Sequence, residues 1–235
     1  KREIFETVVE GVKLAGVPAK NIVVWDQVDG GLFLQDPALP FLEQKRMLLF
    51  AGKVTDEILL SVPHRFWTFG IPKAIRGILL RDRRLLKLLS RCAFFAVKQA
   101  MREGLTHDAA GDGTPGAVLA IHTAGNLLQW NPHLHGIITE GFFDRAGRFH
   151  HLPELDPKLV EILFEEKLLK ELLKRERISP RLVSSMASWR HSGFSIHSKP
   201  APADPKDPAF FHMLRNRIEI SPFEFLAKVL MHVPS

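Results

Sequence analysis

Residues 131–139 read Asn-Pro-His-Leu-His-Gly-Ile-Ile-Thr, and they are the most informative stretch of the chain. We predict a strand over residues 133–139, with Asn131-Pro132 as a break before it. Residues i and i+2 of a strand share a face, so His133 and His135 point the same way and Leu134 points into the core. Two imidazoles on one face are half of a divalent-metal site. The alternative is a pair of surface or hydrogen-bonded histidines.

A third metal ligand does not follow from the motif itself. Residues 117–123, Ala-Val-Leu-Ala-Ile-His-Thr, predict a neighbouring strand, and the chain turns at 124–126 between the two strands. His122 lies on that neighbouring strand and is the candidate third ligand if it faces the same way. Three oxygen-bearing alternatives remain open: Asn126, Gln129 and Asn131.

Helices are expected before and after these strands in the sequence. Asp156-Pro157 combines a capping carboxylate with proline at the first helical position and predicts a helix to about residue 176. The other expected elements are helices over 3–15 and 42–59, a strand over 22–25, a β-prone segment within 62–72, and one broken or two consecutive helices over 73–103, interrupted at 81–84. Residues 106–116 predict a loop, and the proline-rich stretch 199–208 predicts no regular element.

The charge of the chain favours a polyanionic partner. A chain of 235 residues with net charge +6 and pI near 9.6 is long enough for one good core and has a surface suited to nucleic acid. The basic candidates for DNA contact are Lys73, Arg76, Arg81, Arg83, Arg84, Lys87 and Arg91. The alternative for this run is a solvated helix face. Phe66, Trp67 and Phe69 are candidates either for base stacking or for the core, and the core is the simpler interpretation.

Several other sites can be set aside. Cys92 is the single cysteine, so no disulfide or cysteine-based zinc cluster can form, and we expect it to be buried. Residues 111–116 satisfy G-x-G-x-x-G but lead from a loop into a strand, so they are not a dinucleotide fingerprint. No apolar stretch reaches about 18 residues, and no signal peptide opens the chain. We therefore expect no membrane partner and a cytoplasmic location. The chain does not begin with Met, which suggests a fragment.

The chain from about residue 43 to 235 resembles rolling-circle insertion-sequence transposases of the HUH superfamily. The superfamily is named for a His-hydrophobic-His pair, which is His133-Leu134-His135 in this chain. The segments that carry the resemblance are 44–46, 62–72, 131–135, 188–195, 222–227 and 232–234. The most specific of them is 188–195, Ser-Trp-Arg-His-Ser-Gly-Phe-Ser, in which Arg190 is a candidate to hold a phosphate or orient a metal ligand.

The resemblance implies an α+β fold, an antiparallel sheet that carries the His-x-His strand and is flanked by helices. It implies Mg²⁺ or Mn²⁺ held by the histidine pair and a third side chain, for which we take His122. It also implies a bacterial protein whose partner is single-stranded DNA at mobile-element ends. In the family the metal polarises a phosphodiester that a tyrosine attacks.

Two departures from the family change the functional prediction. Residues 1–41 contain no cysteine where the family has a zinc module, so we assign 1–41 to a separate, poorly defined segment and 42–235 to an incomplete transposase domain. The tyrosine expected between residues 194 and 222 is missing, and the chain contains no tyrosine at all. Neither His212 nor Ser221 is a credible replacement, so no catalytic nucleophile is assigned.

We therefore expect a decayed or truncated DNA transposase that does no covalent chemistry. Two alternatives stay open. One is a small metal-dependent hydrolase in which His122, His133 and His135 bind the metal and water attacks. The other is a non-enzymatic DNA-binding remnant.

Overall fold

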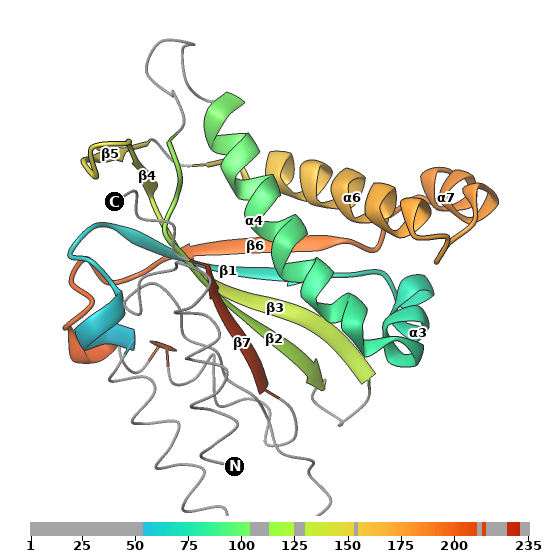
Figure 1. Ribbon diagram of the computed structural model, residues 1–235, viewed down its shortest axis with the longest axis horizontal. Coiled ribbons are helices and arrows are strands. Elements are labelled where there is room, and N and C mark those ends of the chain that lie inside the picture. The colour runs from blue at the N-terminus through green and yellow to red at the C-terminus, as the bar shows by residue number, and fades with distance from the viewer. Residues whose placement is uncertain are drawn as a thin grey trace, which may run out of the picture.

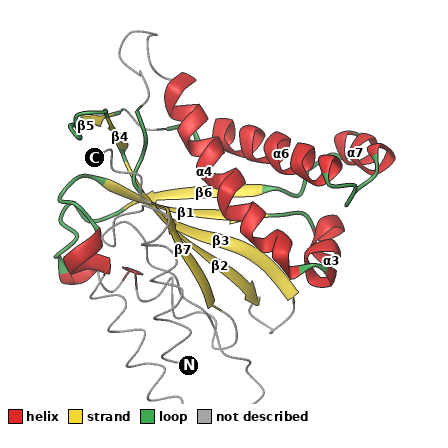
Figure 2. Cartoon of the chain, viewed as in Figure 1, coloured by secondary structure: helices red, strands yellow, loops and turns green. Residues whose placement is uncertain are grey.

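The computed structural model describes residues 54–103, 113–124, 130–152, 155–210, 213–214 and 225–230. Within them, five antiparallel strands form a sheet in the order β6-β1-β3-β2-β7, and helices pack against one of its faces (Figure 1). Figure 2 shows the same arrangement of helices and strands. The predicted α+β class, with the His-x-His strand in an antiparallel sheet flanked by helices, is confirmed.

The strand that carries the two histidines is central in the sheet. β3 (Trp130–Thr139) pairs with β1 (His64–Gly70) on one side and with β2 (Ala117–Ala124) on the other. The outer strands are β6 (Ser195–Pro200), beside β1, and β7 (Phe225–Leu230), beside β2. A separate hairpin of β4 (Gly141–Phe143) and β5 (Phe149–His151) follows β3 directly.

The predicted break at Asn131-Pro132 is wrong, because β3 begins at Trp130 and runs through both residues. Proline removes a ladder hydrogen bond and is normally excluded from central strands. Pro132 escapes that cost because the pairing with β1 extends only to His133. On the other side, the ladder with β2 shifts register between His122 and Ala124, so a bulge lies next to Pro132.

The helices of the described residues begin in some cases with a capping side chain and in others without one. They are α3 (Lys73–Arg81), α4 (Leu86–Glu103), α6 (Pro157–Lys174) and α7 (Pro180–Ala187), with a π-helical segment η3 (Val54–Ile58) and a 3-10 turn η4 (Arg83–Leu85). The Asp156 side chain accepts a hydrogen bond from the Lys158 amide at 2.8 Å, as expected for a helix start. Asp82 caps η4 in the same way and interrupts the helical run at the predicted place.

Two apolar clusters cover the two faces of the sheet. The larger cluster joins Phe69, Ile121 and Leu134 to the apolar sides of α3, α4 and α6. The smaller cluster lies on the opposite face and includes Phe66 and Phe210. Since Phe66, Trp67 and Phe69 are all buried, the core interpretation of these aromatics is confirmed. Cys92 is also buried, and burial raises the pKa of its thiol to about 12.

The remaining segments agree with the predictions in part. Residues 113–116 lead into β2 rather than into a helix, which excludes a dinucleotide fingerprint. The proline-rich stretch is regular at its start, because β6 extends through Pro200. As an edge strand, β6 can accept proline there. No described helix is long and apolar enough to cross a membrane. The elements expected within residues 1–53 lie outside the described residues.

Candidate metal centre

Three histidines converge on the face of the sheet opposite α4. Along β3, His133 and His135 alternate with Leu134, which belongs to the core beneath the helices. His122 on β2 is paired directly with His133, so it shares their face. The ring centroids of His122 and His135 are 4.5 Å apart, those of His133 and His135 5.0 Å, and those of His122 and His133 5.3 Å.

The three side chains are close enough to share one ion. One ring nitrogen from each lies within 4.8 Å of the others. Metal–nitrogen bonds of about 2.0–2.1 Å place the ligands of a tetrahedral ion roughly 3.3 Å apart. To ligate one ion, the three nitrogens would therefore have to lie closer together than they do in this structure. The structure brings the three predicted ligands together, while metal binding by them stays a prediction.

Neighbouring groups fix the ring orientations of the β3 pair. The His133 Nδ1 lies 2.7 Å from the Asn131 carbonyl oxygen, and because a carbonyl only accepts, this nitrogen donates and Nε2 keeps the lone pair. Thr68 Oγ1 lies 3.3 Å from His135 Nδ1 in the adjacent strand β1. Both contacts direct Nε2 to the ligand role, as outer partners of metal-bound histidines do. Asn131 thus contributes to the site through its backbone. Asn126 and Gln129 lie outside the described residues.

Burial favours the neutral form of His122 and of His133. The side chain of His122 is fully enclosed, and burial, followed by His135 and His133, lowers its pKa to about 2. Burial also lowers the pKa of His133, with a smaller contribution in the same direction from the Arg76 guanidinium. A metal binds the neutral imidazole, so no protons have to be displaced from His122 and His133 near neutral pH.

The donor set bears on which ion fits. The group of possible ligands in the described part of the chain consists of three imidazoles without a carboxylate. Imidazole nitrogen suits first-row transition metals, whereas Mg²⁺ takes oxygen ligands. Of the two ions that the resemblance implied, Mn²⁺ therefore fits this set better than Mg²⁺, and Zn²⁺ fits it as well.

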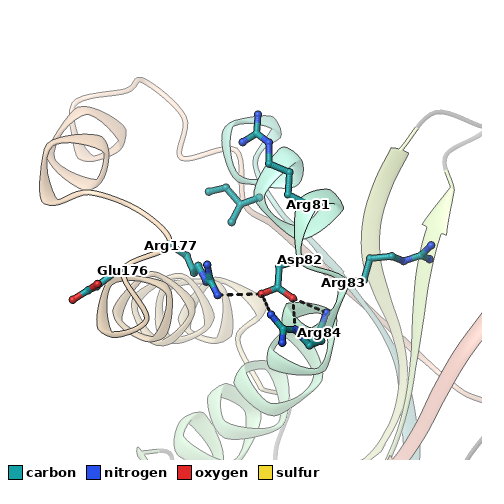
Figure 3. Close-up of a pocket in the computed structure, with 7 residues that line it drawn as sticks. Arg81, Asp82, Arg83, Arg84, Glu176 and Arg177 are labelled. Carbon is teal, nitrogen blue, oxygen red and sulfur yellow. Dashed lines mark hydrogen bonds and ion pairs between the residues drawn. The ribbon is translucent and has the colours of Figure 1, made fainter.

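The predicted basic residues lie on α3, η4 and α4, and three of them contact other residues of the chain. Arg76 donates from Nε and Nη2 to the Ile71 carbonyl at 3.0 and 2.9 Å, at the end of β1. The Arg83 guanidinium lies 5.6 Å from the Trp130 ring, and Arg84 turns to Asp82 (Figure 3). The other four, which are exposed, are Lys73, Arg81, Lys87 and Arg91. Their contact with DNA stays a prediction.

The segment around Arg190 forms the turn that leads from α7 into β6. Gly193 has a φ of +77°, and a Cβ there would lie 2.9 Å from Pro72, so glycine is required for this close approach. The Ile196 amide then donates to Glu161 on α6 at 3.2 Å. Arg190 itself is exposed, and it does not belong to the histidine group. The segment thus fixes the entry of β6, and a phosphate contact of Arg190 stays a prediction.

Trp130 and Arg177 were not singled out from the sequence, and Thr68 belonged only to the resemblance segment 62–72, with no role at the site. Thr68 lies in β1, where successive side chains point to opposite faces of the sheet. That alternation alone is only a weak indication that Thr68 lies beside the histidines. Trp130 donates from Nε1 to the Arg76 carbonyl at 2.8 Å and thereby joins the start of β3 to α3. Arg177 reaches Asp82, which is 95 positions away, and no local pattern indicates such a contact.

The comparisons with known proteins bear on the segment that contains the histidines. Residues 116–206 match a family model described as "Putative transposase". This range begins just before β2 and contains His122, His133 and His135 as well as α6, α7 and β6. No curated protein and no solved structure matches the chain. The match supports a transposase family as the origin of this segment.

Proposed function

We propose that this chain is a transposase-derived protein of the HUH type that binds single-stranded DNA of mobile-element ends and holds a divalent metal between His122, His133 and His135. The observation that carries the proposal is the convergence of these three histidines on one face of the sheet, within the segment that matches a transposase family. A metal bound there would polarise a phosphodiester.

The residues of the chain prepare the site in three ways. Leu134 is fully buried and anchors β3, so the histidines on either side of it are held toward the opposite face. Thr68 and the Asn131 carbonyl fix the two rings. The positive charge of Arg76 acts on His133, where it lowers the pKa, and it would favour a nearby DNA phosphate.

The chain has no phenolic side chain to attack a phosphodiester, since it contains no tyrosine. His212 and Ser221 lie outside the described residues. We therefore propose binding of metal and DNA without the covalent strand transfer of the family. Any cleavage of DNA would then use water as the nucleophile.

A second candidate function, a small metal-dependent hydrolase, is favoured by one observation. The third member of the group is a histidine, and three histidines with one open position are a donor set of hydrolytic zinc sites. Tight binding of Zn²⁺ without any effect on affinity for single-stranded DNA would favour the hydrolase. A metal that strengthens DNA binding would favour the transposase-derived protein.

Calorimetric titration with Mn²⁺ and with Zn²⁺ tests the metal centre. We expect one ion per chain for the wild type and loss of binding in His133→Ala. The matched control is His197→Ala: His197 is opposite Thr68 in the register of β6 with β1 but is exposed and outside the group. Equal binding by His133→Ala and the wild type would contradict the proposed centre.

A further inference from the structure

A cavity lined by arginines lies apart from the histidines, between η4 and the end of α6. It has a volume of about 550 Å³ and is lined by Ile78, Arg81, Asp82, Arg83, Arg84, Glu176 and Arg177 (Figure 3). The lining holds four arginines and two acidic residues, so its formal net charge is positive. Arg84, from η4, and Arg177, from the turn after α6, both reach the carboxylate of Asp82.

The geometry of these two arginines is fixed by the backbone and by Asp82. Arg84 donates from Nε and Nη2 to the two carboxylate oxygens of Asp82 at 2.8 and 3.0 Å. Arg177 donates from Nη2 to the same carboxylate at 3.2 Å. The Arg177 amide in turn donates to the Leu172 carbonyl at 2.9 Å and the Glu176 amide to that of Leu173 at 2.8 Å, which is a Schellman turn.

The ion cluster leaves donors available to a further anion. A guanidinium has five N–H groups, and the hydrogen bonds to Asp82 use two of Arg84 and one of Arg177. The side chains of Arg84 and Arg177 are 86% and 46% exposed and line the cavity, so an anion that enters it can reach them. Exposed ion pairs add little to stability, so stability alone gives a weak reason for this concentration of arginines.

The cavity lies next to the end of the sheet that holds the histidine site. η4 follows α3 directly, and the Arg76 carbonyl of α3 accepts the hydrogen bond of Trp130, three positions before His133. Arg83, which lines the cavity, lies over the same Trp130 ring. Arginine beside an aromatic ring is a combination that single-stranded nucleic acids use for stacking and backbone contact.

We propose that the cavity at Arg84 and Arg177 binds a phosphate of the single-stranded DNA, at a position other than the phosphate held at the histidines. This inference rests on the proposed function, because DNA is the ligand in both. The planar guanidinium fork matches phosphate oxygens, and Asp82 holds two forks ready in one place. Arg177, which is outside the predicted basic run, is thereby a DNA-contacting residue.

The experiment measures affinity for a fluorescein-labelled oligothymidylate by anisotropy at several salt concentrations, in EDTA so that metal plays no part. We expect Arg177→Gln to weaken binding several-fold and to lower the slope of log affinity against log salt by about 0.7, the value for one phosphate contact on a single strand. The matched control is Arg175→Gln, which removes the same charge two positions away, where the side chain binds Glu171 and does not line the cavity.

A third variant separates phosphate binding from a structural role of the cluster. Asp82→Asn removes the competing negative charge and keeps an oxygen that can cap η4, so it strengthens DNA binding if the cavity takes phosphate. If the cluster only ties η4 to α6, Asp82→Asn and Arg177→Gln both lower the melting temperature and neither raises affinity. That result, or equal slopes for Arg177→Gln and Arg175→Gln, would contradict phosphate binding in the cavity. It would not affect the proposed metal centre. No binding by the wild type would overturn both the cavity and the DNA partner.

Discussion

We expect one buried imidazole, that of His64, to make the protein less stable in acid. His64 at the start of β1 packs edge-on against Phe210, with ring centroids 6.1 Å apart. Burial lowers its pKa to about 4, although a hydrogen bond to the Val62 backbone acts in the opposite direction. In the unfolded chain the ordinary histidine pKa of about 6.5 applies. The unfolded state therefore binds this proton more readily than the folded state.

The sign of the pH dependence follows from this difference. The contribution of His64 to stability is complete above about pH 6.5 and is lost as the pH falls toward 4. Between pH 7 and pH 5 we expect the metal-free protein to lose about 1–2 kcal/mol of unfolding free energy through this residue. Urea denaturation at the two pH values measures the loss, which His64→Leu should reduce by that amount. An unchanged pH dependence in His64→Leu would show that His64 is accessible to protons in the folded protein.

The histidine site was partly predictable at this scale. The shared face of His133 and His135 follows from two-residue periodicity, which needs no knowledge of the rest of the fold. His122 remained one of four candidates, because its face depends on the register between β2 and β3. A bulge between His122 and Ala124 interrupts that register, and no local pattern in the sequence marks the bulge.

At the scale of single elements, the start of α6 was predictable from its capping residues and its end was not. Asp156-Pro157 predicted its first turn, while the predicted end near residue 176 was two residues late. The helix ends at Lys174, and Glu176 adopts a φ of +54° in the Schellman turn. Glycine is the usual residue there because it has no Cβ to strain the left-handed conformation. A glutamate gives no such signal in the sequence.

We expect Glu176→Gly to stabilise the protein by about 0.5–1 kcal/mol, because relief of the left-handed strain exceeds the added entropy of the unfolded chain. Chemical denaturation measures the change. The opposite-sign control is Glu166→Gly: Glu166 is exposed in the middle of α6, and glycine there costs about 1 kcal/mol. Destabilisation by both variants would mean that the Glu176 side chain makes a contribution larger than the strain.

For β3 the predicted element was too short, whereas for α6 it was too long. Proline usually marks a break, and the sequence alone places the start of the strand at His133. The three extra residues are possible because Pro132 lies beyond the end of β1 and next to a bulge in the ladder with β2. Such exceptions depend on the lengths of the partner strands, which a local pattern does not contain.

At the scale of the whole molecule, the sheet places the large core and the histidine group on opposite faces. One face carries the large core beneath α3, α4 and α6, and the other carries the histidines. The α+β class followed from the family resemblance, but the strand order β6-β1-β3-β2-β7 did not. The pairing of β1 with β6 joins Thr68 to His197, two residues far apart in the sequence, and long-range partners of this kind leave no local periodicity.

The whole chain also limits the chemistry that the proposed metal centre can support. A covalent phosphotyrosine bond needs a phenolic oxygen, and none of the 235 residues supplies one. A serine hydroxyl is a weak nucleophile unless a neighbouring base activates it. Attack by His133 or His135 would remove a proposed metal ligand. We therefore expect that the protein forms no covalent adduct with single-stranded DNA, with Mn²⁺ or without it.

Incubation with labelled single-stranded oligonucleotides and Mn²⁺, followed by a denaturing gel, tests this expectation. Attack by water would leave cleaved strands with a free end and no attached protein, whereas a protein nucleophile would shift the label by the mass of the chain. The matched reaction with His133→Ala shows whether any cleavage depends on the metal centre. A shifted band in the wild type would show that another residue has replaced the tyrosine. The proposal of DNA binding without covalent strand transfer would then be wrong, because the chain would retain the first chemical step of a transposase.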